Sequence, residues 1–129
     1  MFKKKLLSIH LNEFNYNFLN NGAKKFKCKN IQKILKFKKP KTYSVDRTQD
    51  KDLDPWVQTV TINTGKSSNS HKVFKTGQPV PKNLIQIWDI LSKRKINCAI
   101  WGTMNTYFKN NSHIKIFFPD PWNKQVKIK

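Results

Sequence analysis

Short apolar runs alternating with amphipathic segments dominate the hydrophobic pattern of the chain. Residues 5–11, 96–101 and 113–118 each have the length and composition of a buried strand. Segments with helical spacing separate them, and strands joined through helices pair most economically in parallel. The pattern predicts an α/β fold with a partial doubly wound, mainly parallel sheet and flanking helices.

Three other segments have the apolar spacing of helices. Gly22 weakens or caps the first, and Asn30 provides the N-cap of the second, which covers residues 30–37. The third is the clearest amphipathic helix of the chain. Their apolar positions are Phe14, Phe18 and Leu19 in the first, Ile31, Ile34 and Leu35 in the second, and Leu84, Ile87, Trp88 and Leu91 in the third.

Residues 56–64 fit either a strand or a helix. The segment is rich in valine, threonine and isoleucine, which favour a strand by propensity. In a helix, however, Trp56, Val60 and Asn63 would share one face. Gly65 ends the element in either case.

The predicted elements leave long connections and an incomplete sheet. Residues 36–53 carry no apolar periodicity and are expected to form a long surface loop, and residues 66–70 are expected to form a shorter one. Three parallel strands make a poor closed core. We therefore expect either that a partner completes the sheet, for example by self-association, or that the chain is the front part of a longer protein.

The chain is strongly positive. Its 129 residues hold 26 Lys and Arg against 7 Asp and Glu, a formal net charge of +19, which is typical of proteins that bind nucleic acid or acidic membranes. Only Arg47 and Arg94 are arginines, whereas a surface that recognises phosphate usually recruits the planar fork of Arg. Much of the charge is therefore consistent with the background of an AT-rich genome.

Cysteine usage and the N-terminal residues bear on location. Cys28 and Cys98 lie in no CxxC motif and no His-rich neighbourhood, so we predict reduced packing residues rather than a zinc site or a disulfide. Residues 6–11 are too short and too polar for a signal peptide. No stretch approaches the roughly 18 apolar residues of a membrane span. We expect a cytoplasmic protein.

Asn12 and Glu13 are the first candidates for chemistry, because they follow the first predicted strand. Open α/β sheets bind ligands at the carboxyl ends of their strands, and a carboxylate there is a hard metal ligand. In the alternative, Asn12 only caps the following helix and Glu13 interacts with the positive end of that helix. Both interpretations stay open.

A second candidate cluster begins at Asp54. Asp54 as N-cap and Pro55 at the first helical position make a standard helix start, whose N–H groups can hold a phosphate or sulfate oxyanion. His71 follows in a loop, where a lone histidine is more often at the surface than catalytic. Asp120 begins another Asp-Pro-Trp motif, which either positions a loop at the same sheet edge or forms a plain turn.

The order of these motifs resembles the alkaline phosphatase superfamily, in particular its phosphodiesterase/nucleotide-pyrophosphatase-like and sulfatase-like members. Residues 6–19 resemble the first strand and the aromatic-rich helix of that superfamily. Residues 56–74 resemble its nucleophile helix, which closes with Thr64, Gly65 and His71. Three further similar segments are Ile85-Gln-Ile-Trp-Asp-Ile-Leu, Ala99-Ile-Trp-Gly-Thr-Met-Asn and Phe118-Pro-Asp-Pro-Trp. By this resemblance residues 1–129 are one N-terminal portion of an α/β domain, and residues 124–129 are a terminal extension.

The resemblance implies a metal-dependent hydrolase of phosphate or sulfate esters, usually a zinc enzyme. The metal-binding position falls on Asn12, with Glu13 beside it as the stronger ligand. The nucleophile position falls on Pro55, which has no nucleophilic atom, so Asp54 and Thr59 are the remaining catalytic candidates. The other metal ligands of the superfamily lie beyond this chain. We therefore expect an incomplete site and no turnover by the chain alone.

The sequence leaves two other functions open. A small basic nucleic-acid-binding protein is indicated by the Lys-rich residues 24–41, which include Phe26 and Phe37. A non-catalytic binding relative of the hydrolases would also fit the missing nucleophile. The shared-site hypothesis makes a geometric prediction, that the Glu13 and Asp54 carboxylates lie roughly 4 to 6 Å apart, as ligands of one ion would.

Overall fold

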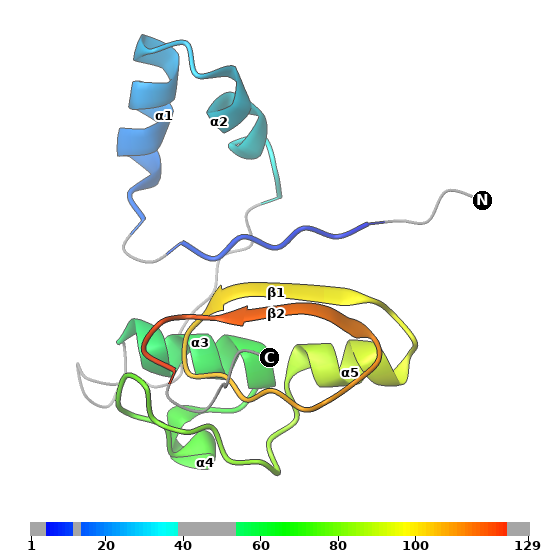
Figure 1. The fold of residues 1–129 in the computed structure, drawn as a ribbon. Coiled ribbons are helices and arrows are strands. Elements are labelled where there is room, and N and C mark those ends of the chain that lie inside the picture. Colours follow the sequence, from blue (N-terminus) through cyan, green and yellow to red (C-terminus); the bar gives the residue numbers. More distant parts are fainter. Residues whose placement is uncertain (1–4, 12–13, 39–53, 124–129) are drawn as a thin grey trace. The chain divides into compact units, whose positions relative to one another are not determined.

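The computed structural model describes residues 5–11, 14–38 and 54–123, and the chain forms two compact units (Figure 1). Unit 1 is Met1–Thr42 and unit 2 is Tyr43–Lys129. The helices of unit 1 are α1 (Tyr16–Lys25) and α2 (Lys29–Ile34). The elements of unit 2 are α3 (Pro55–Thr64), α4 (Ser68–His71), α5 (Ile87–Lys93), β1 (Cys98–Thr103) and β2 (Ile114–Pro119).

The two helices of unit 1 form a short helical hairpin. Asn15 is the N-cap of α1, and its side-chain oxygen accepts from the Phe18 N–H at 2.9 Å. Gln32 of α2 donates to the carbonyl of the buried Ala23 at 2.9 Å, which joins the two helices. Gly22 lies inside α1, so it does not cap the helix, and of the two predicted roles only the weakening of the helix stays open. The predicted start of the second helix was wrong, because α2 begins after Cys28 rather than after Asn30.

The prediction of a strand over residues 5–11 was also wrong. The segment has no regular secondary structure, and its large side chains, such as Leu6 and Leu7, are exposed. An apolar run becomes a strand only when its backbone groups pair with a neighbouring strand, and a sequence pattern does not supply that neighbour. Of the long loop predicted over residues 36–53, residues 39–53 lie outside the described part of the chain, as does the predicted extension 124–129.

The ambiguous segment in unit 2 is a helix. Val57, Val60 and Asn63 are all buried and recur every three residues, so they form one face of α3. Val60 packs with Val73 and Val80 in a small apolar cluster. Tertiary packing of this face outweighs the strand propensity of the valines and threonines.

The ends of α3 follow the sequence signals. Asp54 is the N-cap residue and Pro55 occupies the first helical position. Gly65 ends the helix with φ of 64°, a left-handed conformation that glycine adopts without cost. The predicted loop over residues 66–70 was partly wrong, because residues from Ser68 onward form the single turn α4.

The sheet of unit 2 consists of two parallel strands. Ile100 of β1 pairs with Phe117 of β2, and the register places Thr103 opposite Pro119. Both strands lie within two residues of their predicted positions, and their parallel pairing confirms the α/β class. The crossover between them, through residues 104–113, contains no helix.

Within the described part of unit 2, helices cover one face of the sheet only. Ile100 and Ile114 pack against Trp88 of α5, and Figure 1 shows α3 and α5 on the same side of the strands. On the opposite face, Trp101 is 76% exposed and stacks on Phe118 with ring centroids 4.4 Å apart. Within the described part of unit 2 the sheet is therefore not doubly wound, because its helices lie on one side only.

Candidate ligand site at the carboxyl edge of the sheet

Because β1 and β2 are parallel, their carboxyl ends meet at one edge of unit 2, which we call the carboxyl edge. The edge is formed by the residues that follow Thr103 of β1 and Pro119 of β2. The Asp120 N–H donates to the Thr103 carbonyl at 3.3 Å, which continues the strand pairing by one residue. In open α/β sheets this is the edge at which ligands bind.

Asn105 connects the carboxyl edge with the first turn of α3. Its side chain accepts from the Gly77 N–H at 2.8 Å and donates to the Lys75 carbonyl at 2.8 Å. It also lies 3.5 Å from the carbonyl of Trp56, the second residue of α3. Asn105 is buried and has φ of 41°, a conformation that Asn tolerates better than other non-glycine residues. One side chain thereby brings the start of α3 to the end of β1.

A second contact at the carboxyl edge requires glycine. Gly77 has φ of 67°, and a Cβ atom at this position would clash with the carbonyl oxygen of Trp122. Asn123 donates from its side chain to the Thr106 carbonyl at 2.8 Å. These contacts fix the Asp-Pro-Trp segment after β2 against the loops that precede α5 and follow β1.

Asp120 is an unusual acid at this edge. It is only 7% exposed, and among the described residues no donor makes a well-formed hydrogen bond to either of its carboxylate oxygens. Desolvation by burial raises the pKa of the Asp120 carboxyl, and the nearby backbone N–H groups of Asn123 and Trp122 offset this rise in part. Buried carboxylates are normally paired, so Asp120 stands out among the described acids of unit 2.

The candidate residues predicted from the sequence fall in different parts of the chain. Asp54 is half-buried as the N-cap of α3, and its side chain makes no capping hydrogen bond. Thr59 lies in the second turn of the same helix and is half-buried. Asn12 and Glu13 lie outside the described residues, so the predicted separation of the Glu13 and Asp54 carboxylates stays a prediction.

His71 is buried, contrary to the surface position that is usual for a lone loop histidine. Its Nδ1 accepts from the Val73 N–H at 3.0 Å, so the neutral ring carries its proton on Nε2. Nε2 lies 3.1 Å from the Thr61 hydroxyl. The ring therefore connects α4 with α3 and has a structural role in unit 2.

Asp89, the third acidic residue in the described part of unit 2, has a structural role like that of His71. Asp89 accepts from the Gln86 N–H at 2.9 Å and forms a capping box at the start of α5. It also makes an ion pair with Lys109 at 3.4 Å. Among residues 5–11, 14–38 and 54–123 no three His, Cys, Asp or Glu side chains gather where a metal ion could bind.

Sequence reasoning missed Asn105 and left the place of Asp120 open. The signal for Asn105 was its position four residues after a predicted strand, but only the fold shows what its amide contacts. For Asp120 the structure favours the first of the two alternatives, because the motif does lie at the sheet edge.

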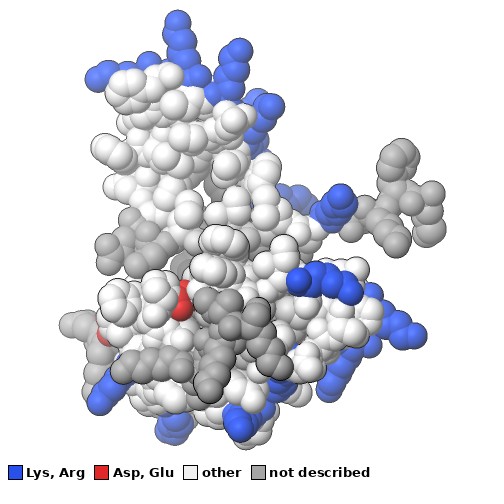
Figure 2. Space-filling model, in the orientation of Figure 1, with Lys and Arg blue, Asp and Glu red and all other residues white. Residues whose placement is uncertain are grey.

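Lysines and arginines are scattered over the face of the molecule seen in Figure 2, and acidic side chains are few there. Among the described residues no helix is long and apolar enough to cross a membrane. Comparisons with known protein families, with curated proteins and with solved structures found no match.

Proposed function

We propose that the chain contributes part of a phosphate- or sulfate-ester site of the alkaline phosphatase type, located at the carboxyl edge. The motif order described from the sequence supports this function. The observation that carries it is the contact of Asn105 with Trp56, since it brings the N-terminus of α3 to the strand ends. A helix N-terminus at the carboxyl edge of a parallel sheet is a favourable place for an oxyanion.

The roles within this proposal follow from residue chemistry. The Trp56 N–H in the first turn of α3 holds the ester oxyanion, since Pro55 has no N–H and the Val57 and Gln58 N–H groups donate to the Asp54 carbonyl. The Asp54 carboxylate lies beside it as a ligand for a cation. Because Pro55 stands where the superfamily has its nucleophile, the proposal is binding without turnover by this chain. Thr59 supplies a hydroxyl one turn further along the helix.

Zinc is the cofactor that the resemblance implies, with Asn12 and Glu13 as its proposed ligands. A complete zinc site needs three or four protein ligands. Since the described residues do not gather three such side chains, we assign no chemical step to a metal here.

Ester binding can be tested by NMR on ¹⁵N-labelled full-length chain, titrated with phenyl phosphate and with diphenyl phosphate. We expect amide shifts at Trp56, Val57 and Asn105, and no release of phenol. Phenol, which lacks the phosphate group, is the control ligand and should not shift these amide signals. If phosphate esters shift only the amide signals of lysine-rich surface segments, the proposed site is wrong.

A second candidate function is nucleic-acid binding by unit 1, and one observation favours it. The described residues of unit 1 hold eight lysines and no acidic side chain. Phe18 is 80% exposed and Phe26 is 71% exposed, so aromatic rings are available for base stacking. We infer that α1 and α2 form a surface for single-stranded nucleic acid.

Salt dependence separates this function from ester binding. Binding of a fluorescent oligonucleotide should weaken steeply between 50 and 200 mM salt, because each neutralised phosphate releases counterions. Phe26→Ala should weaken binding on the order of tenfold through lost stacking. A flat salt response, or a Phe26→Ala variant that binds as tightly as the wild type, would rule out the nucleic-acid surface.

A further inference from the structure

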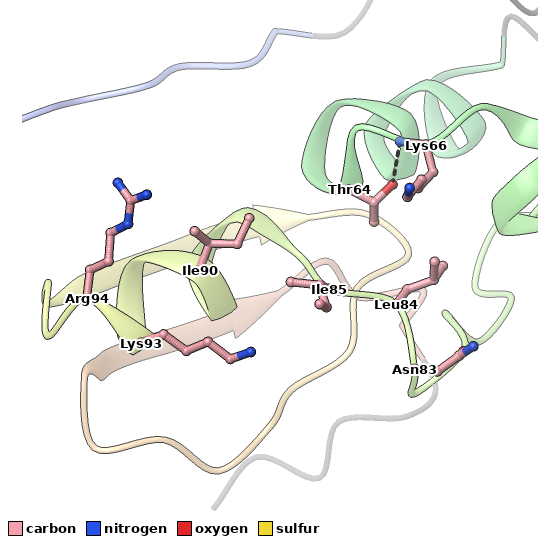
Figure 3. Close-up of a pocket in the computed structure, with 8 residues that line it drawn as sticks. All are labelled: Thr64, Lys66, Asn83, Leu84, Ile85, Ile90, Lys93 and Arg94. Atoms are coloured by element: carbon pink, nitrogen blue, oxygen red, sulfur yellow. Dashed lines mark hydrogen bonds between the residues drawn. The ribbon is translucent and has the colours of Figure 1, made fainter.

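A hollow of about 470 Å³ lies in unit 2, away from the carboxyl edge. Figure 3 shows its lining, which comes from the end of α3, the segment before α5, and α5 itself. Thr64 belongs to the last turn of α3, and Asp54 to the opposite end of that helix. Ten residues of helix span about 15 Å, so the hollow is distinct from the proposed ester site.

The hollow has an apolar centre. Leu84, Ile85 and Ile90 are its hydrophobic lining residues, and the lining as a whole is predominantly apolar. Ile85 is 48% exposed and Ile90 is 46% exposed, although side chains of this kind are usually buried. The volume falls within the range of small-molecule sites.

Three cationic side chains border this apolar centre. Figure 3 shows Lys66 on one side of the isoleucines, with Lys93 and Arg94 on the other. Within the described part of the chain, none of these three side chains has a hydrogen-bond or ion-pair partner and no acidic residue lines the hollow. The site therefore combines apolar surface with positive charge that is free to bind an anion.

We propose that this hollow binds a single-chain amphiphilic anion, meaning an alkyl chain with one carboxylate or phosphate head group. The alkyl chain packs on Leu84, Ile85 and Ile90, since burying it removes apolar surface from water on both partners. The head group binds at Arg94, whose guanidinium can donate two parallel hydrogen bonds, and Lys93 and Lys66 add positive charge at other points of the rim. The occupant is a dissolved monomer rather than a membrane, because the apolar surface is concave and small.

The test on the wild-type protein compares ligands that differ in one property. Octyl and decyl phosphate, both kept below their micelle concentrations, are titrated into ¹⁵N-labelled chain. Decyl phosphate should bind roughly tenfold more tightly, since each buried methylene contributes about 0.8 kcal/mol. Inorganic phosphate tests the head group alone, and decyltrimethylammonium tests the chain with the opposite charge; both should bind at least about tenfold more weakly than decyl phosphate.

Variants test the named contacts. Lys93→Gln combined with Arg94→Gln should weaken decyl phosphate binding on the order of tenfold, because charge-assisted hydrogen bonds to the head group are lost. Ile90→Ser should remove most of the gain from the longer chain. Lys75→Gln combined with Lys115→Gln removes the same total charge from exposed positions outside the hollow and should leave binding within twofold.

The proposal is overturned by equal binding of anionic and cationic amphiphiles, by the absence of chain-length dependence, or by equal loss in the two double variants. It is also overturned if the protein binds vesicles containing anionic lipid but no monomeric alkyl phosphate, since the surface would then dock on a membrane. Amide shifts at Ile85, Ile90 and Arg94, with those of Trp56 unchanged, are the supporting result. Because the two sites have separate reporter amides, failure here is distinguishable from failure of the ester site.

Discussion

Asp120 provides the sharpest test of how the carboxyl edge is built. Its carboxylate is buried and makes no well-formed hydrogen bond within the described part of the chain, so its charged form lacks the hydration it has in the unfolded chain. We expect Asp120→Asn to stabilise unit 2 at neutral pH. The amide has nearly the same shape and carries no charge.

The expected increase in the free energy of unfolding follows from the cost of burying a polar group without a hydrogen-bond partner. That cost is about 1 to 3 kcal/mol, and it is larger for a charged group than for a neutral one. A gain of about 1 kcal/mol raises the melting temperature of a domain of this size by roughly 4 to 8 °C. We therefore expect an increase of several degrees at pH 7.

The stability difference between Asp120→Asn and the wild type should depend on pH in a defined direction. Burial raises the pKa of the Asp120 carboxyl in the folded state above its ordinary value of 3.8, so the folded chain binds its proton more tightly than the unfolded chain does. Through this group, stability falls as the pH rises from 3.8 through the folded pKa, and the cost is then constant at higher pH. The advantage of Asp120→Asn should therefore shrink on acidification and disappear below about pH 3.8.

The assay is urea unfolding followed by tryptophan fluorescence between pH 3 and pH 8. Asp89→Asn is the matched control, because Asp89 accepts from the Gln86 N–H and pairs with Lys109. That substitution should destabilise the protein at neutral pH, opposite to the effect at Asp120. A destabilised Asp120→Asn variant, or a gain that does not change with pH, would refute the interpretation of an uncompensated buried charge.

Three other predictions concern residues of unit 2. Gly77→Ala should cost at least about 2 kcal/mol in urea unfolding, since it adds left-handed backbone strain to a clash with the Trp122 carbonyl; a neutral result would show that the two loops separate easily. Asn105→Gly keeps the backbone freedom but loses the side-chain bonds, and should cost about 2 to 3 kcal/mol, with Asn105→Ala costing more because of its positive φ; equal stability of both variants would contradict this. Burial raises the pKa of the Cys98 thiol, so mass spectrometry should find it alkylated more slowly at pH 8 than glutathione, and faster reaction would contradict its burial.

Local signals in the sequence determined several features correctly. Asp54, Pro55 and Gly65 fix the start and end of α3, because capping chemistry and left-handed glycine are properties of a few adjacent residues. The two strands that form were predicted within two residues, since both are short apolar runs between breaks. Their parallel direction was also predicted correctly, but not for the predicted reason, because the crossover between them contains no helix.

Tertiary contacts decided the rest. Residues 5–11 and the strand Ile114–Pro119 are similar apolar runs, yet only the second has a neighbour whose N–H and C=O groups pair with its own. The burial of Asp120, the contacts of Asn105 and the hollow beside Ile90 depend on segments 20 to 50 residues apart that meet only in the folded unit. A sequence pattern records which residues prefer burial, whereas the fold alone decides which of them share a neighbour.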